Sequence, residues 1–171
     1  MPDRSGNSSV IEQAPYGIWG CGVKTGSGQV AIIVTWLTQL SFNPTLIGIS
    51  LETDGPFLRH LVNAGEFTVS ALPKDQGKAI ARKILKAGMN QGARDHAGLF
   101  RIEPGWQEAI GGALGAMTCR VSARHACGDH TLVVAEVIAE HRWHRGEALQ
   151  LRDTGWKYRR PVPVKDHSTT D

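Results

Sequence analysis

The stretch from Val30 to Glu52 constrains the fold of this chain more than any other part of the sequence. It contains two apolar runs rich in β-branched residues, Val30–Val34 and Thr45–Leu51, and each run predicts a β-strand. A polar segment joins them and ends at Pro44, which favours an extended backbone at the residue before it. A simple hairpin connection needs only about two to five residues. We therefore interpret the longer segment 35–43 as a functional loop between two core strands.

This connecting segment carries short hydrogen-bonding side chains around one indole. Its candidate binding residues are Thr35, Trp36, Leu37, Thr38, Gln39 and Ser41. Such a set suits a flat heterocycle with a polar tail, because hydroxyl and amide groups bind the tail and ring edge while an aromatic or aliphatic wall covers the ring face. The alternative is a barrel rim whose hydroxyl groups satisfy only their own backbone. Trp36 is open to the same two interpretations, since a Trp buried at a barrel end needs no ligand.

The length and composition predict one globular domain. A chain of 171 residues, of which 41% are hydrophobic and 20% charged, is long enough to bury a substantial core. We find no apolar run near the roughly 20 residues that span a membrane, and Met1–Ser9 lacks the apolar centre of a secretory signal. The net charge of +3 is mild and dispersed, which argues against a nucleic-acid partner and suits an anionic phosphate ligand.

The cysteines and histidines do not predict a metal site. Cys21, Cys119 and Cys127 are odd in number and lack the spacing of metal ligands, so we expect free thiols in a reducing cytoplasm. His141 and His144 flank Trp143, and on a strand end this spacing places the two imidazoles on opposite faces.

The remaining chain predicts a mainly β fold with peripheral helices. Further strands are expected at Ile18–Val23, Phe67–Leu72, Met117–Cys127, Thr131–Glu140 and Leu149–Tyr158. One helix is expected to open within Thr53–Pro56, and a second is expected at Lys74–Ala87. Asp54 is the expected N-cap of the first helix, and Gly65 its expected end. Gly20 and Gly22 lie on one face of the first strand, where they would let another backbone or a ligand approach closely. Because hairpins dominate over crossover helices, we expect a closed or nearly closed antiparallel barrel.

Four motifs, taken in order, carry a resemblance to a known family. They are Pro15-Tyr16-Gly17, the segment Thr35–Pro44, Gly65–Leu72 and Gly128-Asp129-His130-Thr131-Leu132. Over roughly Pro15 to Arg159 the chain resembles the flavin reductase-like, FMN-binding split β-barrel family. The resemblance implies a split antiparallel β-barrel at residues 15–160. We expect a flexible N-terminus at 1–14 and an extended C-terminal tail at 161–171.

The same resemblance implies FMN or FAD as cofactor and NAD(P)H as electron donor. It places Thr35–Ser41 and Thr53 at the flavin, and His130 where the nicotinamide approaches. Hydride transfer from nicotinamide C4 to flavin N5 needs no acid or base, so His130 would orient the nicotinamide or stabilise charge on the reduced flavin. We interpret Asp129 as a turn residue. The family also implies a homodimer and, as a possible partner, a monooxygenase or an electron-transfer protein.

One segment departs from the family pattern. Relatives often carry Lys, Ser, Arg or Thr around the positions of Thr53, Gly55 and Phe57, where they help to hold the phosphate. Here Asp54 places a negative charge in that segment. Either backbone amides and Thr53 hold the phosphate, or FMN binds weakly as a diffusible substrate. Two alternatives to a flavin reductase therefore stay open: a flavoredoxin-like electron carrier with tightly bound FMN, and a non-catalytic flavin- or haem-binding barrel.

Overall fold

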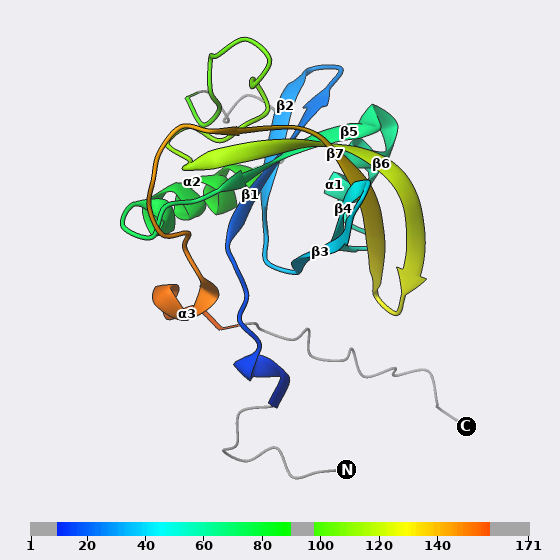
Figure 1. Cartoon of the computed structure of the whole chain (residues 1–171), viewed down its shortest axis with the longest axis horizontal. Coiled ribbons are helices and arrows are strands. Elements are labelled where there is room, and N and C mark those ends of the chain that lie inside the picture. The colour runs from blue at the N-terminus through cyan, green and yellow to red at the C-terminus, as the bar shows by residue number, and fades with distance from the viewer. Residues whose placement is uncertain (1–9, 90–97, 158–171) are drawn as a thin grey trace, which may run out of the picture.

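The structure, a computed structural model of the chain, describes residues 10–89 and 98–157 (Figure 1). Residues 1–9, the end of the expected last strand at Tyr158 and the whole tail at 161–171 lie outside the described residues. The described chain begins with a short 3-10 helix, η1 (Val10–Gln13).

Seven antiparallel strands form one sheet in the described part of the chain. They are β1 (Trp19–Thr25), β2 (Gly28–Val34), β3 (Leu37–Phe42), β4 (Thr45–Glu52), β5 (Glu66–Ala71), β6 (Gly115–Cys127) and β7 (His130–Arg142). Their order in the sheet is β2-β1-β5-β6-β7-β4-β3, so β2 and β3 stand at its two ends and the barrel stays split. In Figure 1 the β6–β7 hairpin bends downwards at the right, and β3 lies at the lower side of the sheet, above α3. The expected split antiparallel barrel is confirmed.

The first helix, α1 (Pro56–Ala64), packs on β1, β2 and β5. It ends as expected at Gly65, which adopts a φ of 73° and donates its N–H to the Leu61 carbonyl. The expectation for its beginning is wrong, because the N-cap is Gly55 and not Asp54. The Gly55 N–H donates to the Glu52 carbonyl in a turn, so the helix begins one residue later than expected.

Two hydrophobic clusters lie on the two faces of the sheet. The cluster inside the barrel, called here the barrel core, includes Cys21, Val34, Ile47, Ile49, Leu51, Phe57, Leu61, Phe67, Val69, Cys119, Val133 and Ala135. The second cluster joins α2 (Gly77–Met89) and the segment 98–114 to the outside of β1 and β2. Its buried members are Ile18, Ala31, Leu72, Ala81, Ile84, Leu99, Ile110 and Leu149.

The glycines of β1 allow the segment 98–114 to lie directly on the sheet. A Cβ atom at Gly22 would collide with the Glu108 carbonyl oxygen, and one at Gly20 would lie 2.5 Å from Ile110 Cγ1. The Ile110 N–H donates to the buried Ser70 hydroxyl at 2.9 Å, which fixes the segment at this point. The expected close approach is therefore made by backbone at Gly22 and by the Ile110 side chain at Gly20.

The contact between Gly22 and Glu108 predicts that a larger residue at position 22 lowers the stability of the fold. We expect Gly22→Ala to lower the free energy of unfolding by about 1–3 kcal/mol, because backbone atoms must move to accept the new methyl group. Gly26→Ala is the matched control, since nothing lies within 4 Å of a Cβ atom at that position. Urea unfolding of the two variants measures the difference. An equal loss of stability in both variants would contradict the contact at Gly22.

Two sequence-based expectations about elements are wrong. Residues 37–42 form the edge strand β3 and not a loop, and β3 pairs with β4 through a turn at the cis Asn43–Pro44 peptide bond. Much of β3 is exposed, so it lacks the apolar pattern that marks a core strand. The expected strand from Leu149 contains the short helix α3 (Leu151–Thr154) instead. The Gln150 N–H donates to the Asp153 carboxylate at 3.0 Å where this helix begins, and Trp156 packs against the second cluster.

Candidate functional site

The exposed side of β3, β4 and β7 forms the candidate site. Residues directly opposite one another in an antiparallel ladder share a face. Gly48 lies opposite Thr38 and Val134, and Glu52 lies opposite His130. We call this surface the outer face; it consists of Thr38, Leu40, Ser41, Gly48, Ser50, Glu52, His130, Leu132 and Val134. The residues that alternate with it in β4 point into the barrel core, and α1 and α2 make their main contacts on β1, β2 and β5.

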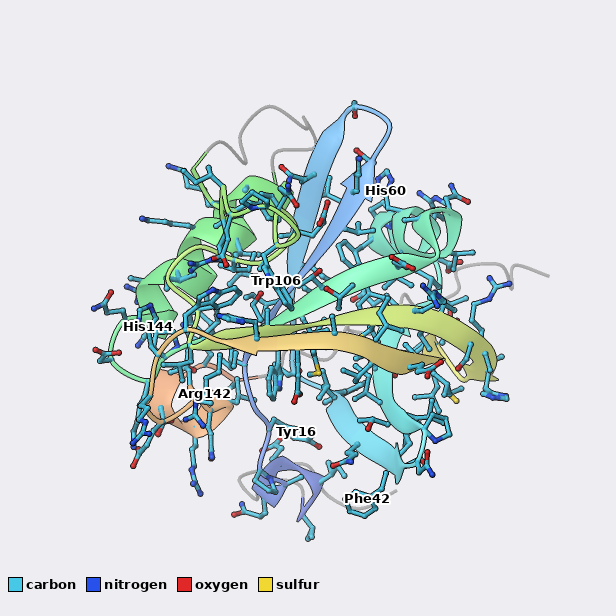
Figure 2. All side chains as sticks on the ribbon, turned by 45° about the horizontal axis from the view of Figure 1, so that its top comes forward. Tyr16, Phe42, His60, Trp106, Arg142 and His144 are labelled. Atoms are coloured by element: carbon cyan, nitrogen blue, oxygen red, sulfur yellow. The ribbon has the colours of Figure 1, made fainter. Side chains whose placement is uncertain are left out.

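Glycine at position 48 brings the apolar side chains of this face together. A Cβ atom there would lie 3.0 Å from Leu40 Cδ1 and 3.1 Å from Leu132 Cδ1. The two leucines therefore meet above Gly48 and form an apolar floor across three strands. Phe42 follows at the end of β3, where it projects from the molecule with 88% of its surface exposed (Figure 2).

Trp36 and His130 lie side by side at one end of this face. Their ring centroids are 4.8 Å apart and the ring planes are tilted by 44°. Trp36 is held by its carbonyl, which accepts a hydrogen bond from the Ser50 N–H at 3.0 Å. Trp36 is 39% exposed, so the pair offers an aromatic wall that a flat ligand can reach.

The His130 ring is also held from its other side. Its Nδ1 lies 2.6 Å from Asp129 Oδ1, and this hydrogen bond lowers the pKa of the Asp129 carboxyl. The imidazole is only 21% exposed, whereas the carboxylate is 84% exposed. The turn itself needs no help from that carboxylate, since Gly128 supplies the positive φ of 69° that a type II′ hairpin turn requires at its first central position.

Thr53 and the beginning of α1 lie beside the hairpin tip. The Thr53 N–H donates to the Asp129 carbonyl at 3.0 Å, and its hydroxyl lies 3.0 Å from the Thr131 hydroxyl. Because the N-cap Gly55 has no side chain, the first-turn N–H groups of α1 carry no side-chain cap. Arg59 Nη1 donates to the Asp54 carbonyl at 3.3 Å, which brings a cation to the same end of the helix.

The polar residues of β3 divide between the two sides of the sheet. Thr38 lies on the outer face, while Leu37 and Gln39 lie opposite the core residues Ile49 and Ile47. Leu37 packs against the barrel core. Gln39 Nε2 donates to the Ser41 carbonyl at 3.2 Å. A bulge between Gln39 and Ser41 changes the register, and it returns Ser41 to the outer face opposite Leu46.

Comparison with known proteins assigns the family. The model of the flavin reductase like domain matches residues 12–158. The chain belongs to this family.

Individual relatives agree with the family assignment. The chain is 30% identical over 136 residues to Putative diflavin flavoprotein A 3 of Nostoc sp., covering 78% of this chain but only 23% of that protein. It is 28% identical over 143 residues to the NADH-dependent FAD reductase of Streptomyces globisporus, covering 82% of this chain and 77% of that protein. Among solved structures, the styrene monooxygenase flavin reductase SMOB of Pseudomonas putida S12 has a TM-score of 0.71 and 25% identity, and covers 90% of this chain and 97% of that chain.

The residues of this flavin reductase-like chain fit a flavin in three respects. The apolar floor of Leu40 and Leu132 continues into the aromatic wall of Trp36 and His130. Hydroxyl groups of β3 lie on the same face. The uncapped beginning of α1, with Thr53 nearby, provides N–H donors of the kind that bind phosphate.

Sequence reasoning missed two residues near the proposed phosphate position. Thr131 was noted only within a motif, yet its hydroxyl pairs with that of Thr53. Arg59 stands in the first turn of α1, so an arginine just after a helix start with no side-chain cap was the available signal. Thr131 was overlooked because its contact with Thr53 depends on the packing of the β6–β7 tip against the β4–α1 connection.

The cysteines are free thiols, and His141 packs against a neighbouring aromatic ring. Burial raises the pKa of the Cys119 thiol to about 12 and raises that of Cys21 as well, whereas Cys127 is exposed. His141 packs 5.2 Å from Trp143, measured between ring centroids. Within residues 10–89 and 98–157, no group of three or more His, Cys, Asp or Glu residues could hold a metal ion. None of the described helices is long and apolar enough to cross a membrane.

Proposed function

We propose that this chain binds FMN on the outer face and acts as an NAD(P)H-dependent flavin reductase. The observation that carries the proposal is the contact between Trp36 and His130, which lies next to hydroxyl groups and near the uncapped beginning of α1. The same site would accommodate FAD, because its additional nucleotide would extend away from the phosphate end. The NADH-dependent FAD reductase relative supports the activity.

Each part of the site has a stated task in this proposal. Trp36 covers part of the flavin ring, while Thr38 and Ser41 bind its polar edge. The first-turn N–H groups of α1, Thr53 and Arg59 hold the phosphate. Thr35, Leu37 and Gln39 support the strand that carries these groups. When bound, the flavin supplies the redox chemistry by accepting hydride from the nicotinamide.

His130 is the residue proposed to meet the nicotinamide. Its partly shielded ring is fixed between Trp36 and Asp129, so little side-chain freedom is lost when a ligand binds against it. A fixed ring can orient the nicotinamide over the flavin, and orientation is the main help that hydride transfer needs from the protein.

The activity is tested with the purified chain. We expect it to oxidise NAD(P)H only when FMN or FAD is present, measured by the loss of NAD(P)H absorbance under air. Flavin fluorescence measures affinity, and the colour of the isolated protein shows whether FMN stays bound. A yellow protein that does not oxidise NADH or NADPH would instead be an electron carrier or a flavin-binding barrel.

We further propose that the outer face forms a homodimer interface. Leu40 in β3 is 47% exposed on this face, and Ile138 in β7 is a second exposed apolar side chain. Exposed apolar side chains that gather on one face are typical of an interface. The flavin would then be shielded from water at the edge of the second copy.

The dimer makes a prediction about Leu40. Leu40→Asp should convert the dimer into a monomer and weaken FMN binding, because a buried unpaired charge is costly at an interface. Ile102→Asp is the matched control, since Ile102 is 98% exposed on the segment 98–114. Sedimentation and light scattering measure the mass. A parent chain that is monomeric and still binds FMN tightly would contradict the proposal.

We propose a cytoplasmic enzyme that passes reduced flavin to a monooxygenase. Two of the three cysteines are buried as free thiols, which suits a reducing compartment. The similarity to the styrene monooxygenase flavin reductase supports an oxygenase partner. Mixing the chain with a flavin-dependent oxygenase and NADH, and following product formation, tests this role.

A further inference from the structure

The contact between Asp129 and His130 has a consequence beyond the binding site proposed above. Asp129 Oδ1 and His130 Nδ1 are 2.6 Å apart, and an ionised carboxylate can only accept hydrogen bonds. The proton in this contact therefore sits on Nδ1. In a neutral imidazole that assignment leaves Nε2 without a proton, as a hydrogen-bond acceptor.

The surroundings hold Asp129 in place for this contact. Gly128 sets the hairpin turn, and the Thr53 N–H binds the Asp129 carbonyl at 3.0 Å, so the backbone of Asp129 is fixed from two sides. The carboxylate itself is not needed for the turn. The neighbouring carboxylate of Glu52 lies across the ladder from His130, and the structure gives it no hydrogen bond to the imidazole among the described contacts.

We infer that Asp129 is a positioning residue that fixes the tautomer and the orientation of His130, so that Nε2 accepts a hydrogen bond from the carboxamide N–H of the nicotinamide. The inference rests on the proposed function, because it assigns a nicotinamide contact to the same site. In this arrangement His130 accepts the hydrogen bond from the nicotinamide and does not donate one. Trp36 fixes the other side of the ring.

The chemical consequence is selectivity for a carboxamide. A nicotinamide analogue with an acetyl group in place of the carboxamide has no N–H to donate, so it loses this hydrogen bond. The parent chain should therefore disfavour reduced 3-acetylpyridine adenine dinucleotide relative to NADH. Variants without the Asp129 carboxylate or the His130 ring should lose part of that preference, because an acceptor no longer faces the carboxamide.

The tautomer is tested first, in the full chain without any ligand. Nitrogen NMR of histidine-labelled protein, recorded at a pH where imidazoles are neutral, distinguishes a proton on Nδ1 from one on Nε2. We expect the Nδ1–H form in the parent and in Glu52→Gln, which removes a nearby charge but not the hydrogen bond. Asp129→Ala, which leaves no acceptor at this position, should shift the ring towards the Nε2–H form. An Nε2–H form in the parent, or an unchanged tautomer in Asp129→Ala, would overturn the inference.

Kinetics then test the positioning role. Asp129→Ala should raise the KM for NADH about fivefold, as expected for one lost hydrogen bond of about 1 kcal/mol, while FMN affinity stays unchanged. It should also reduce the preference for NADH over the acetyl analogue. Asp129→Glu should restore part of both effects. Unchanged KM and unchanged preference in Asp129→Ala would overturn the role in nicotinamide binding.

The two experiments separate this inference from the proposed function. If the parent chain oxidises neither NADH nor NADPH, the proposed reductase activity fails, while the NMR measurement still decides whether Asp129 fixes the tautomer. If the parent is an active reductase and Asp129→Ala shows the parent tautomer, the inference fails and the reductase activity stands.

Discussion

Replacing Thr38 and Ser41 together by alanine should weaken FMN binding about 30-fold. Each hydroxyl is expected to make one hydrogen bond to the flavin, and two such bonds of about 1 kcal/mol each correspond to this change in Kd. Both residues lie on the outer face, on the strand next to the Gly48 floor. Thr38 is exposed and Ser41 half-buried, so their hydroxyls contribute little to the packing of the barrel core.

Flavin fluorescence during titration with FMN measures this effect. The matched control is Thr25→Ala with Ser27→Ala, which removes two neighbouring hydroxyl groups from the exposed β1–β2 turn. Its FMN affinity should equal that of the parent. If the Thr38 and Ser41 variant binds FMN as tightly as the parent, the flavin binds elsewhere on the chain.

Strands with a strong apolar pattern were predictable from the sequence. Residues 45–51 form most of β4, and the alternation in 117–127 predicted β6 and its hairpin with β7. Gly128 marks that hairpin because its backbone adopts a positive φ. The end of α1 at Gly65 was predictable for the same reason. In each case a short stretch of sequence determines the local structure.

The elements that were missed depend on contacts outside their own segment. β3 carries mostly polar or exposed side chains, and it becomes a strand because its backbone pairs with β4. The residues after Leu149 have an apolar content that suits a strand, but Leu151 and Trp156 pack from a short helix and its following turn against the second cluster. Single-segment patterns do not contain this information.

The candidate site was predicted as a list of residues but not as an arrangement. Trp36 and His130 meet because β4 pairs with β3 on one side and with β7 on the other, which brings two distant segments to one end of the sheet. From the sequence, Asp54 was expected to cap the helix and Asp129 was interpreted as a turn residue. The structure gives the cap position to Gly55 and directs the Asp129 carboxylate to His130. Both differences follow from hydrogen bonds that sequence spacing does not specify.

Replacing His130 by alanine should impair nicotinamide binding or hydride transfer and leave FMN affinity nearly unchanged. The loss of one hydrogen bond to a partly charged group is worth about 1–2 kcal/mol, which corresponds to about a 5- to 30-fold rise in KM for NAD(P)H or fall in the reduction rate. Stopped-flow reduction of the FMN complex separates the two effects, because it measures flavin reduction at varied NAD(P)H concentration in a single turnover.

His144→Ala is the matched control for this experiment. His144 is an exposed histidine after β7, and its N–H donates to the Leu114 carbonyl, so it does not belong to the outer face. This variant should reduce bound FMN at the parent rate. A purely structural role of His130 would lower the melting temperature of His130→Ala, because the ring packs on Trp36, and would leave the kinetics per folded molecule unchanged. Unchanged reduction rate and unchanged NAD(P)H affinity would remove His130 from the site and favour a passive flavin-binding barrel over a nicotinamide-using enzyme.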